Sequence, residues 1–383
     1  MIEEISNPYT VGVPLSHFQS SFVGRAEIVL RIQAWSRSAV YSPLLIYGPR
    51  RMGKTSLLRN LQRLLPRQVA FVVIDLQGVS ALATDFAGFL TALASEITRS
   101  ILFTRNIMLP RLSLKSTLDN PQESFDQWMT VLVSTLLLHG IDTLVLALDE
   151  FEALDIAIQD KQLGEENVLG TLRQLIEHHP QIKLLLAGAH ALEEIQGWSN
   201  YLRNAQTLHL SYLTTGEARL LIERPMKDSA LKYEPAAVAR VLHLTHGHPY
   251  LVQLVCSELM HLKNEQTTKL RHHITENDIQ LALPDILLRG SQFFAEIEEN
   301  QVNPEGCHLL YWIARRGYCR LADLQTLAKR HGQCLQVEEA LTQMIQRGTL
   351  ELRAGYYHFQ VELVRMWFAG NESVGQCTNP LSY

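Results

Sequence analysis

The sequence predicts an α/β fold in its first half, a doubly wound parallel sheet, followed by a helical region and a small module of three helices and a β-hairpin. Up to residue 210, apolar runs typical of buried strands alternate with segments of helical periodicity. A glycine-rich turn joins the first of these runs to the helix that follows it. Beyond residue 211 the strand-like runs stop, and helical periodicity takes over.

The glycine-rich turn follows the apolar run Leu44-Leu45-Ile46 and has the spacing of a P-loop. Gly48 and Gly53 allow backbone conformations closed to other residues, so successive N–H groups can surround phosphate oxygens. Lys54 can supply positive charge to the β- and γ-phosphates of a nucleotide, and the Thr55 hydroxyl can ligate Mg²⁺. The sequence therefore predicts a P-loop NTPase whose phosphate-binding residues are Gly48, Pro49, Arg50, Arg51, Met52, Gly53, Lys54, Thr55 and Ser56.

A second apolar run, from Asp142 to Leu148, ends in Asp149-Glu150 and has the form of a Walker B strand. Open parallel sheets bind ligands at the carboxyl ends of their strands, so Asp149 is expected to hold Mg²⁺, directly or through water. Glu150 is expected to act with Lys54 in catalysis by orienting or deprotonating the attacking water. The alternative, a strand that ends in a helix-capping acid, is less favoured beside a P-loop. Glu152 is expected to be a solvated or interface residue.

Two weaker signals flank this site. Phe22-Val23-Gly24-Arg25 precedes an amphipathic helix, and its apolar pair could line an adenine pocket; a simple helix-start turn is the alternative. His190 follows the apolar run that ends at Gly188, beside the expected γ-phosphate. It is either a phosphate-sensing residue or a plain loop histidine.

Composition limits the class of protein. A chain of 383 residues can hold two or three domains, and 46% hydrophobic with 19% charged residues is ordinary for a soluble globular protein. The net charge of −5 gives no general attraction to nucleic acid or to an anionic membrane. The absence of a long uninterrupted apolar run and of a signal peptide predicts no membrane association. Five scattered cysteines indicate reduced thiols, so a cytoplasmic location is expected.

The helical region contains a tight turn, His246-Gly247-His248-Pro249, between two helices. Together with His243, the two histidines of this turn invite a zinc interpretation. No carboxylate or cysteine completes the ligand set, so a helix end followed by a turn is favoured.

On these motifs the chain resembles the STAND and archaeal-type branch of AAA+-related P-loop ATPases, including proteins with an origin-recognition-like ATPase domain. The resemblance spans nearly the whole chain. It rests on the segments Asn7–Tyr9, Phe22–Arg25, Gly48–Ser56, Leu148–Glu150 and Leu244–Tyr250.

The resemblance implies further roles. Val23 and Arg25 become adenosine contacts, and Gly247-His248-Pro249 becomes the turn of a helical lid, in which Pro249 contacts the nucleotide. The chain departs from the family where a polar sensor normally ends a core strand: here Ala187-Gly188-Ala189 precedes His190. The sensor is therefore His190 or missing, and hydrolysis is expected to be slow. Arg203 stands where an arginine finger could project, and a surface role is the alternative.

The module from Asn303 to Phe368 has the element order of a winged helix. Its third helix carries Glu338 and Glu339, and acid on a recognition helix repels phosphate, so a protein-contact role is favoured over DNA binding. The expected divisions are an extended lead-in (1–20), a P-loop nucleotide-binding domain (21–210), a helical lid domain (211–299), a winged-helix domain (300–370) and a tail (371–383).

Two functions remain open. The first is an ATP-binding and ATP-hydrolysing switch that takes ATP, ADP and Mg²⁺ as ligands. Its lid and winged helix would reorient with nucleotide state to engage a protein partner or to drive self-assembly. The second is a DNA-binding initiator or loader that uses the same ATPase core. Steep loss of duplex affinity with rising salt would indicate the second.

Overall fold

The structure is a computed structural model that describes residues 5–15, 22–38, 42–112, 119–189, 204–227, 229–267, 272–301, 304–330 and 336–370. The chain divides into two compact units. Residues 14–211 form one, called here the P-loop unit. Residues 1–13 and 212–383 form the other, called here the C-terminal unit.

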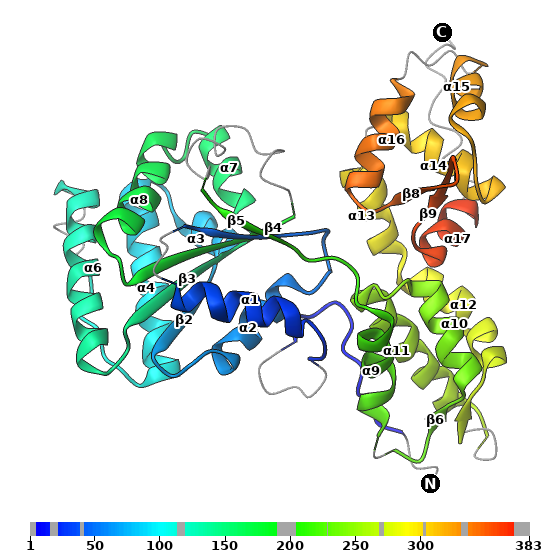
Figure 1. The fold of residues 1–383 in the computed structure, drawn as a ribbon, viewed down its shortest axis with the longest axis horizontal. Coiled ribbons are helices and arrows are strands. Elements are labelled where there is room, and N and C mark those ends of the chain that lie inside the picture. The colour runs from blue at the N-terminus through cyan, green and yellow to red at the C-terminus, as the bar shows by residue number, and fades with distance from the viewer. Residues whose placement is uncertain are drawn as a thin grey trace. The chain divides into compact units, whose positions relative to one another are not determined.

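The P-loop unit is built on a five-stranded parallel sheet with the strand order β2-β3-β4-β1-β5 (Figure 1). The predicted α/β P-loop NTPase fold with a doubly wound parallel sheet is confirmed. Strands β3 and β4 are buried almost throughout, in keeping with their largely apolar sequences. The strands are β1 (Leu44–Tyr47), β2 (Val69–Asp75), β3 (Thr143–Asp149), β4 (Ile182–Gly188) and β5 (Gln206–His209).

Helices cover both faces of this sheet. The connection from β1 to β2 runs along the sheet in the opposite direction to those from β2 to β3 and from β3 to β4, so right-handed crossovers place their helices on opposite faces. Helices α1 and α2 lie on one face, and α4, α6 and α8 lie on the other (Figure 1). The helices are α1 (Ala26–Arg37), α2 (Lys54–Leu64), α3 (Leu76–Leu82), α4 (Phe86–Arg105), α6 (Pro121–Leu138), α7 (Glu152–Gln159) and α8 (Glu165–His178).

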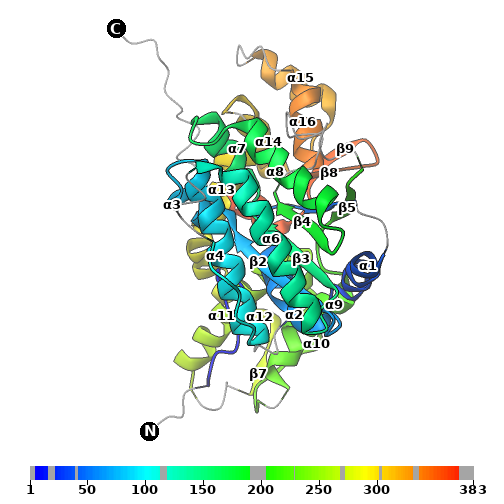
Figure 2. The same ribbon diagram turned by 90° about the vertical axis from the view of Figure 1, so that its left-hand side faces the viewer.

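By length and composition, α4 would be able to cross a membrane. It packs beside α6 (Figure 2) and against β2. Phe89, Leu93 and Ile97 on its apolar face are buried. These contacts are those of a core helix in a layered α/β unit.

The strand register brings the ends of four strands to one edge of the sheet. Asp149 pairs in register with Asp75 on β2 and with Ala187 on β4. Tyr47 at the end of β1 pairs with Gly188, and the N–H of Gly48 donates to the carbonyl of Gly188 at 3.3 Å. The P-loop and the Walker B acids therefore meet at this edge.

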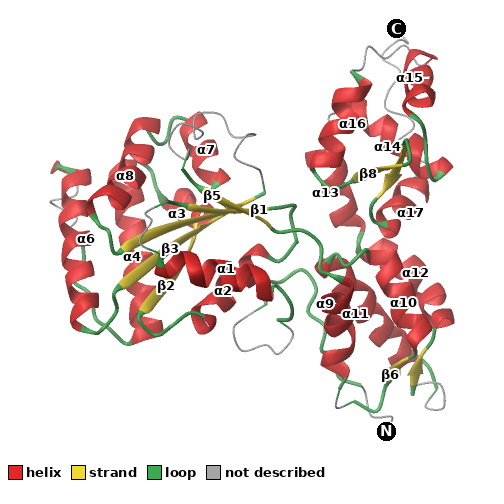
Figure 3. Ribbon diagram, viewed as in Figure 1, coloured by secondary structure: helices red, strands yellow, loops and turns green. Residues whose placement is uncertain are grey.

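The C-terminal unit is mostly helical (Figure 3). The expectation that strands stop at residue 211 is wrong in one detail. The two-residue strands β6 (Lys232–Tyr233) and β7 (His273–Ile274) form a short parallel pair. Between and around them lie α9 (Thr215–Glu223), the 3₁₀ helix η3 (Arg224–Met226), α10 (Pro235–Thr245), α11 (Pro249–Glu265), α12 (Glu276–Arg289) and α13 (Ser291–Gln301).

The last part of this unit contains three helices and a hairpin in the order predicted from the sequence. They are α14 (Pro304–Arg316), α15 (Leu321–Arg330), α16 (Val337–Gln346), β8 (Leu350–Arg353) and β9 (Tyr356–Phe359). A further helix, α17 (Glu362–Gly370), packs against α14 and was not predicted. The assignment of these elements as a winged helix stays a prediction.

The N-terminal segment is extended and belongs to both units. Ile5 exchanges two hydrogen bonds of 2.9 Å with the Asn264 side chain on α11. The Tyr9 hydroxyl donates to the carbonyl of Ile222 at 2.6 Å. Leu15, in the P-loop unit, donates from its N–H to Ser56 Oγ at 3.0 Å. Residues 5–15 are therefore held at both ends by defined hydrogen bonds.

Candidate nucleotide-binding site

The P-loop backbone has the shape of an anion cradle. Gly48 has no room for a side chain, because a Cβ there would collide with the carbonyl oxygen of Leu210. Gly53 (φ 89°) and Arg51 (φ 61°) lie in the left-handed region and turn the chain into α2. Helix α2 begins directly at Lys54, so its first N–H groups and the positive end of its dipole face the loop.

Lys54 is 5% exposed and lies at the centre of the loop. Its ammonium donates to the carbonyl oxygens of Gly48 at 2.8 Å and Pro49 at 3.1 Å. Burial lowers the pKa of Lys54, and the carboxylates of Glu150, Glu152 and Asp149 oppose that shift. The ammonium is thus held by groups that phosphate oxygens can replace.

Asp149, at the end of β3, is 4% exposed. Its Oδ1 accepts the backbone N–H of Glu150 at 3.2 Å. Burial raises the pKa of Asp149, while a hydrogen bond from the Thr55 side chain and the charge of Lys54 oppose the rise. A hydroxyl and a carboxylate in contact are hard oxygen donors of the kind that Mg²⁺ prefers, so Thr55 and Asp149 fit the metal site expected from the sequence.

Glu150 adopts a left-handed backbone conformation (φ 52°), which is uncommon for a residue other than glycine and is concentrated at functional sites. Burial raises the pKa of its carboxyl group, Asp149 and Glu152 add to the rise, and Lys54 opposes it. A carboxylate with a raised pKa is a better proton acceptor at neutral pH than an ordinary one. The geometry suits the predicted role toward water, which stays a prediction.

Glu152 is not the solvated or interface residue that was expected. It begins α7, is half-buried, and accepts a hydrogen bond from the N–H of Ala189 just beyond β4. A Cβ at Gly188 would collide with the Glu152 carboxylate and with the Phe151 ring. The spacing Asp-Glu-Phe-Glu after a strand was the available signal, but only the fold shows which strand this carboxylate reaches.

Arg25 packs under the P-loop. Its backbone is left-handed (φ 63°) at the start of α1, its side chain is 8% exposed, and its guanidinium donates to the carbonyl of Met52 at 3.2 Å. Val23 is 9% exposed. Arg25 therefore supports the loop from its buried side, and the adenosine contacts assigned to Val23 and Arg25 stay predictions.

The remaining predicted residues lie in different places. Met52 is buried, and Ser56 Oγ accepts the N–H of Leu15 as described above. His190 and Arg203 lie outside the described residues. Pro249 is the first residue of α11 and belongs to the C-terminal unit. Its predicted nucleotide contact stays a prediction.

The turn from His246 to Pro249, called here the lid turn, is held by backbone and aromatic contacts. Gly247 (φ 72°) has no space for a Cβ, which would collide with the carbonyl oxygen of Leu213. The N–H of Leu213 donates to the Gly247 carbonyl at 3.0 Å. His248 is 4% exposed and lies among the rings of Tyr212, Tyr250 and Phe293, at centroid distances of 5.9, 6.4 and 5.1 Å.

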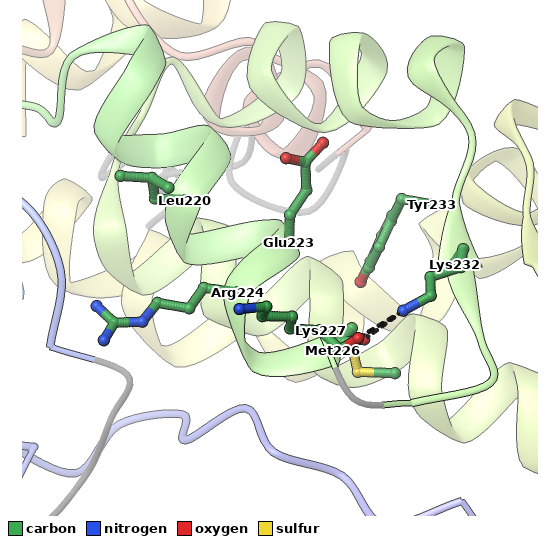
Figure 4. A pocket seen from close by; sticks show the side chains of 7 residues that line it. All are labelled: Leu220, Glu223, Arg224, Met226, Lys227, Lys232 and Tyr233. Atoms are coloured by element: carbon green, nitrogen blue, oxygen red, sulfur yellow. Dashed lines mark hydrogen bonds between the residues drawn. The ribbon is translucent and has the colours of Figure 1, made fainter.

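A pocket of about 540 Å³ lies in the C-terminal unit (Figure 4). Its charged side chains do not converge on one point, and the Lys232 ammonium donates to the carbonyls of Met226 at 3.2 Å and Lys227 at 2.7 Å. The pocket therefore lacks the phosphate-directed groups that the P-loop presents. It is lined by Leu220, Glu223, Arg224, Met226, Lys227, Lys232 and Tyr233.

Comparison with known proteins agrees with this site. Residues 41–196 match a family model described as an AAA domain. Human NACHT domain- and WD repeat-containing protein 1 is 26% identical over 141 residues. That alignment covers 35% of this chain and only 8% of the length of that relative.

Two solved structures resemble nearly the whole chain. A Walker-type ATPase of Pyrococcus abyssi has a TM-score of 0.68 at 16% identity, covering 92% of this chain and 97% of that chain. The ORC2 protein of Aeropyrum pernix, solved in ADPNP–ADP complexes, has a TM-score of 0.56 at 13% identity, with the same two coverages. At these identities the likeness shows the fold.

The predicted likeness to AAA+-related ATPases is confirmed as an AAA domain and as a shared fold, and the narrower STAND assignment stays a prediction. The AAA match spans both the P-loop and the Walker B acids, which the structure brings together. The chain therefore has a P-loop NTPase fold, and its residues 41–196 are similar to an AAA domain.

Proposed function

We propose that the protein is a molecular switch that binds ATP with Mg²⁺, hydrolyses it slowly, and changes the position of its lid and C-terminal module with nucleotide state to engage a protein partner. One observation carries the proposal. Lys54, the Thr55–Asp149 pair and Glu150 gather at one sheet edge, and the Lys54 ammonium donates to two P-loop carbonyls that phosphate oxygens can replace.

Each residue of the site has a distinct part in this proposal. Lys54 turns from its carbonyl partners to the β- and γ-phosphates, and Thr55 and Asp149 hold Mg²⁺, which screens the phosphate charge. Glu150 orients the attacking water and accepts its proton. Slow turnover is expected because the described end of β4 offers only Ala187, Gly188 and Ala189 where a polar sensor would stand.

The energy available from a γ-phosphate is sufficient for a switch. Moving a two-state equilibrium from 1:99 to 99:1 needs about 5.5 kcal/mol of differential binding. Two or three charge-assisted hydrogen bonds at roughly 1.5–3 kcal/mol each supply that amount. Lys54 and the N–H groups at the start of α2 are the donors on the P-loop side.

Contacts within the C-terminal unit support a lid that moves together with the C-terminal module. The Tyr212 ring lies 5.1 Å from that of His246 in the lid turn, and the Tyr212 hydroxyl donates to the carbonyl of Gly348, after α16, at 2.8 Å. A second connection runs from Phe293 through Phe294 to Trp367 on α17, at centroid distances of 5.5 and 5.7 Å. A displaced lid turn would therefore carry α16 and α17 with it.

The surface of α16 favours a protein partner. Its sequence contains no lysine or arginine, and its exposed face presents Glu338, Glu339, Thr342, Gln343 and Gln346. Such a face repels DNA phosphates. A DNA-acting initiator that uses the same ATPase core is the second candidate, on the resemblance described in the sequence analysis.

Two measurements test the proposal. The size of the full chain, by small-angle scattering and sedimentation, should differ between ADP and a non-hydrolysable ATP analogue, both with Mg²⁺. Identical profiles in both nucleotides would contradict a switch. Duplex binding that is nanomolar and falls steeply with salt would instead support the initiator.

A further inference from the structure

The carboxylate of Glu152 is fixed beside the phosphate cradle, although Glu152 belongs neither to the P-loop nor to the Asp149-Glu150 pair. It accepts the N–H of Ala189 and covers Gly188, which leaves no space for a side chain. Gly188 in turn accepts the N–H of Gly48, the first glycine of the P-loop, at 3.3 Å. Glu152 is thus held two hydrogen bonds away from the loop that would surround the phosphates.

Charges of both signs surround Lys54 at this edge: three carboxylates and the guanidinium of Arg50. Lys54 interacts electrostatically with Glu150, Glu152 and Asp149. Asp149 is assigned with Thr55 to the proposed metal site, and Glu150 is assigned to the proposed handling of water. Glu152 has neither assignment, because its carboxylate is directed to the backbone beyond β4.

We propose that Glu152 determines nucleotide specificity by lowering the affinity for a triphosphate relative to a diphosphate. This inference rests on the proposed nucleotide site. A fixed carboxylate near the end of β4 repels a γ-phosphate more than it repels the β-phosphate, which lies deeper against Lys54 and the start of α2. A neutral polar sensor at this position would favour the γ-phosphate; a carboxylate does the reverse.

Glu152→Gln tests the charge separately from the geometry, because the amide oxygen can still accept the Ala189 N–H. The dissociation constants of ADP and of a non-hydrolysable ATP analogue are measured by calorimetry on the full chain, with Mg²⁺. The ratio of analogue to ADP dissociation constants should fall about tenfold in Glu152→Gln, mainly through tighter binding of the analogue. Glu166→Gln, which removes an exposed negative charge from α8 in the same unit, should leave the ratio unchanged.

Glu152→Ala is a second variant that distinguishes an effect of charge from an effect of structure. It also provides the test if Glu152→Gln fails to fold. It removes the charge together with the hydrogen bond, so the ratio should move in the same direction. Equal loss of both affinities in Glu152→Ala, with an unchanged ratio in Glu152→Gln, would overturn the inference and leave Glu152 a structural residue. If neither nucleotide binds the wild-type chain, it is the proposed nucleotide site that fails.

Discussion

Two turns in this protein each contain a glycine packed against a backbone carbonyl, but the side chains around the two glycines differ. Gly48 in the P-loop and Gly247 in the lid turn each lie where a Cβ would collide with a backbone carbonyl, of Leu210 and Leu213 respectively. Around Gly48 the neighbours are an ammonium and carboxylates. Around Gly247 the neighbours are the rings that enclose His248.

The difference shows which turn is complete without a ligand. Burial lowers the pKa of Lys54 and raises those of Asp149 and Glu150, so all three shifts disfavour the charged forms that phosphate and Mg²⁺ would stabilise. The aromatic packing of the lid turn needs no such partner. The charged groups of the P-loop site would be stabilised by a bound phosphate and Mg²⁺, whereas the lid turn is stabilised by its own packing.

The largest expected effect is loss of nucleotide binding in Lys54→Ala. Removing the ammonium deletes the main positive charge of the cradle, so affinity for ADP and ATP should fall by about two to three orders of magnitude. Equilibrium binding of a fluorescent nucleotide measures it. Arg59→Ala, which removes an exposed positive charge from the same helix, is the control and should bind normally. Unchanged affinity in Lys54→Ala would rule out the phosphate assignment.

At the lid turn the expected effect is on stability. Gly247→Ala introduces a Cβ into a left-handed residue and against the Leu213 carbonyl, so unfolding free energy should fall by about 2–3 kcal/mol. Urea unfolding measures the change. Gly216→Ala is the matched control, because nothing lies within 4 Å of its Cβ position near the start of α9. Equal behaviour of the two variants would mean that the lid turn is not a fixed joint.

Glu150→Gln should separate binding from chemistry within the P-loop unit. The amide keeps the size of the side chain but cannot accept a proton, so ATP binding should persist while turnover slows at least about tenfold. Phosphate release under single-turnover conditions gives the rate. Normal turnover in this variant would show that another group handles the water.

The smallest effect is a gain in stability for Asp149→Asn without ligands. Burial raises the pKa of Asp149 in the folded state, so the native protein binds more protons than the unfolded chain and loses stability as pH rises through the raised pKa. At pH 7 the variant should be about 1 kcal/mol more stable than the wild type, and the gain should vanish below about pH 4, where the carboxyl is protonated in both states.

Unfolding curves between pH 4 and 8 measure that difference. Asp142→Asn, at an exposed position just before the same strand, should show no gain. A less stable Asp149→Asn protein at neutral pH would show that the contacts of Asp149 with Thr55 and Lys54 outweigh the cost of its burial.

The P-loop and the Walker B strand could be predicted from sequence because their chemistry depends on residue types at fixed local spacing. Strands β1, β3 and β4 followed from largely apolar runs of strand length, whereas β5 is mostly polar and exposed. The hydrogen bonds of Glu152 and Arg25 could not be predicted from the sequence, because their partners lie far away along the chain. The carboxylate of Glu152 bonds to Ala189, 37 positions away, and the guanidinium of Arg25 bonds to Met52, 27 positions away. Such pairs depend on how the strands align in the sheet, and no local sequence pattern specifies that alignment.

The contacts of the N-terminal segment affect the order in which the two units fold during synthesis. Ile5 bonds to Asn264, which a ribosome adds 259 residues later. Residues so distant in sequence close their loop slowly, whereas residues 14–211 are continuous and can fold while synthesis goes on. A nascent chain would therefore fold its P-loop unit first, and residues 5–13 would stay unattached until α11 emerges.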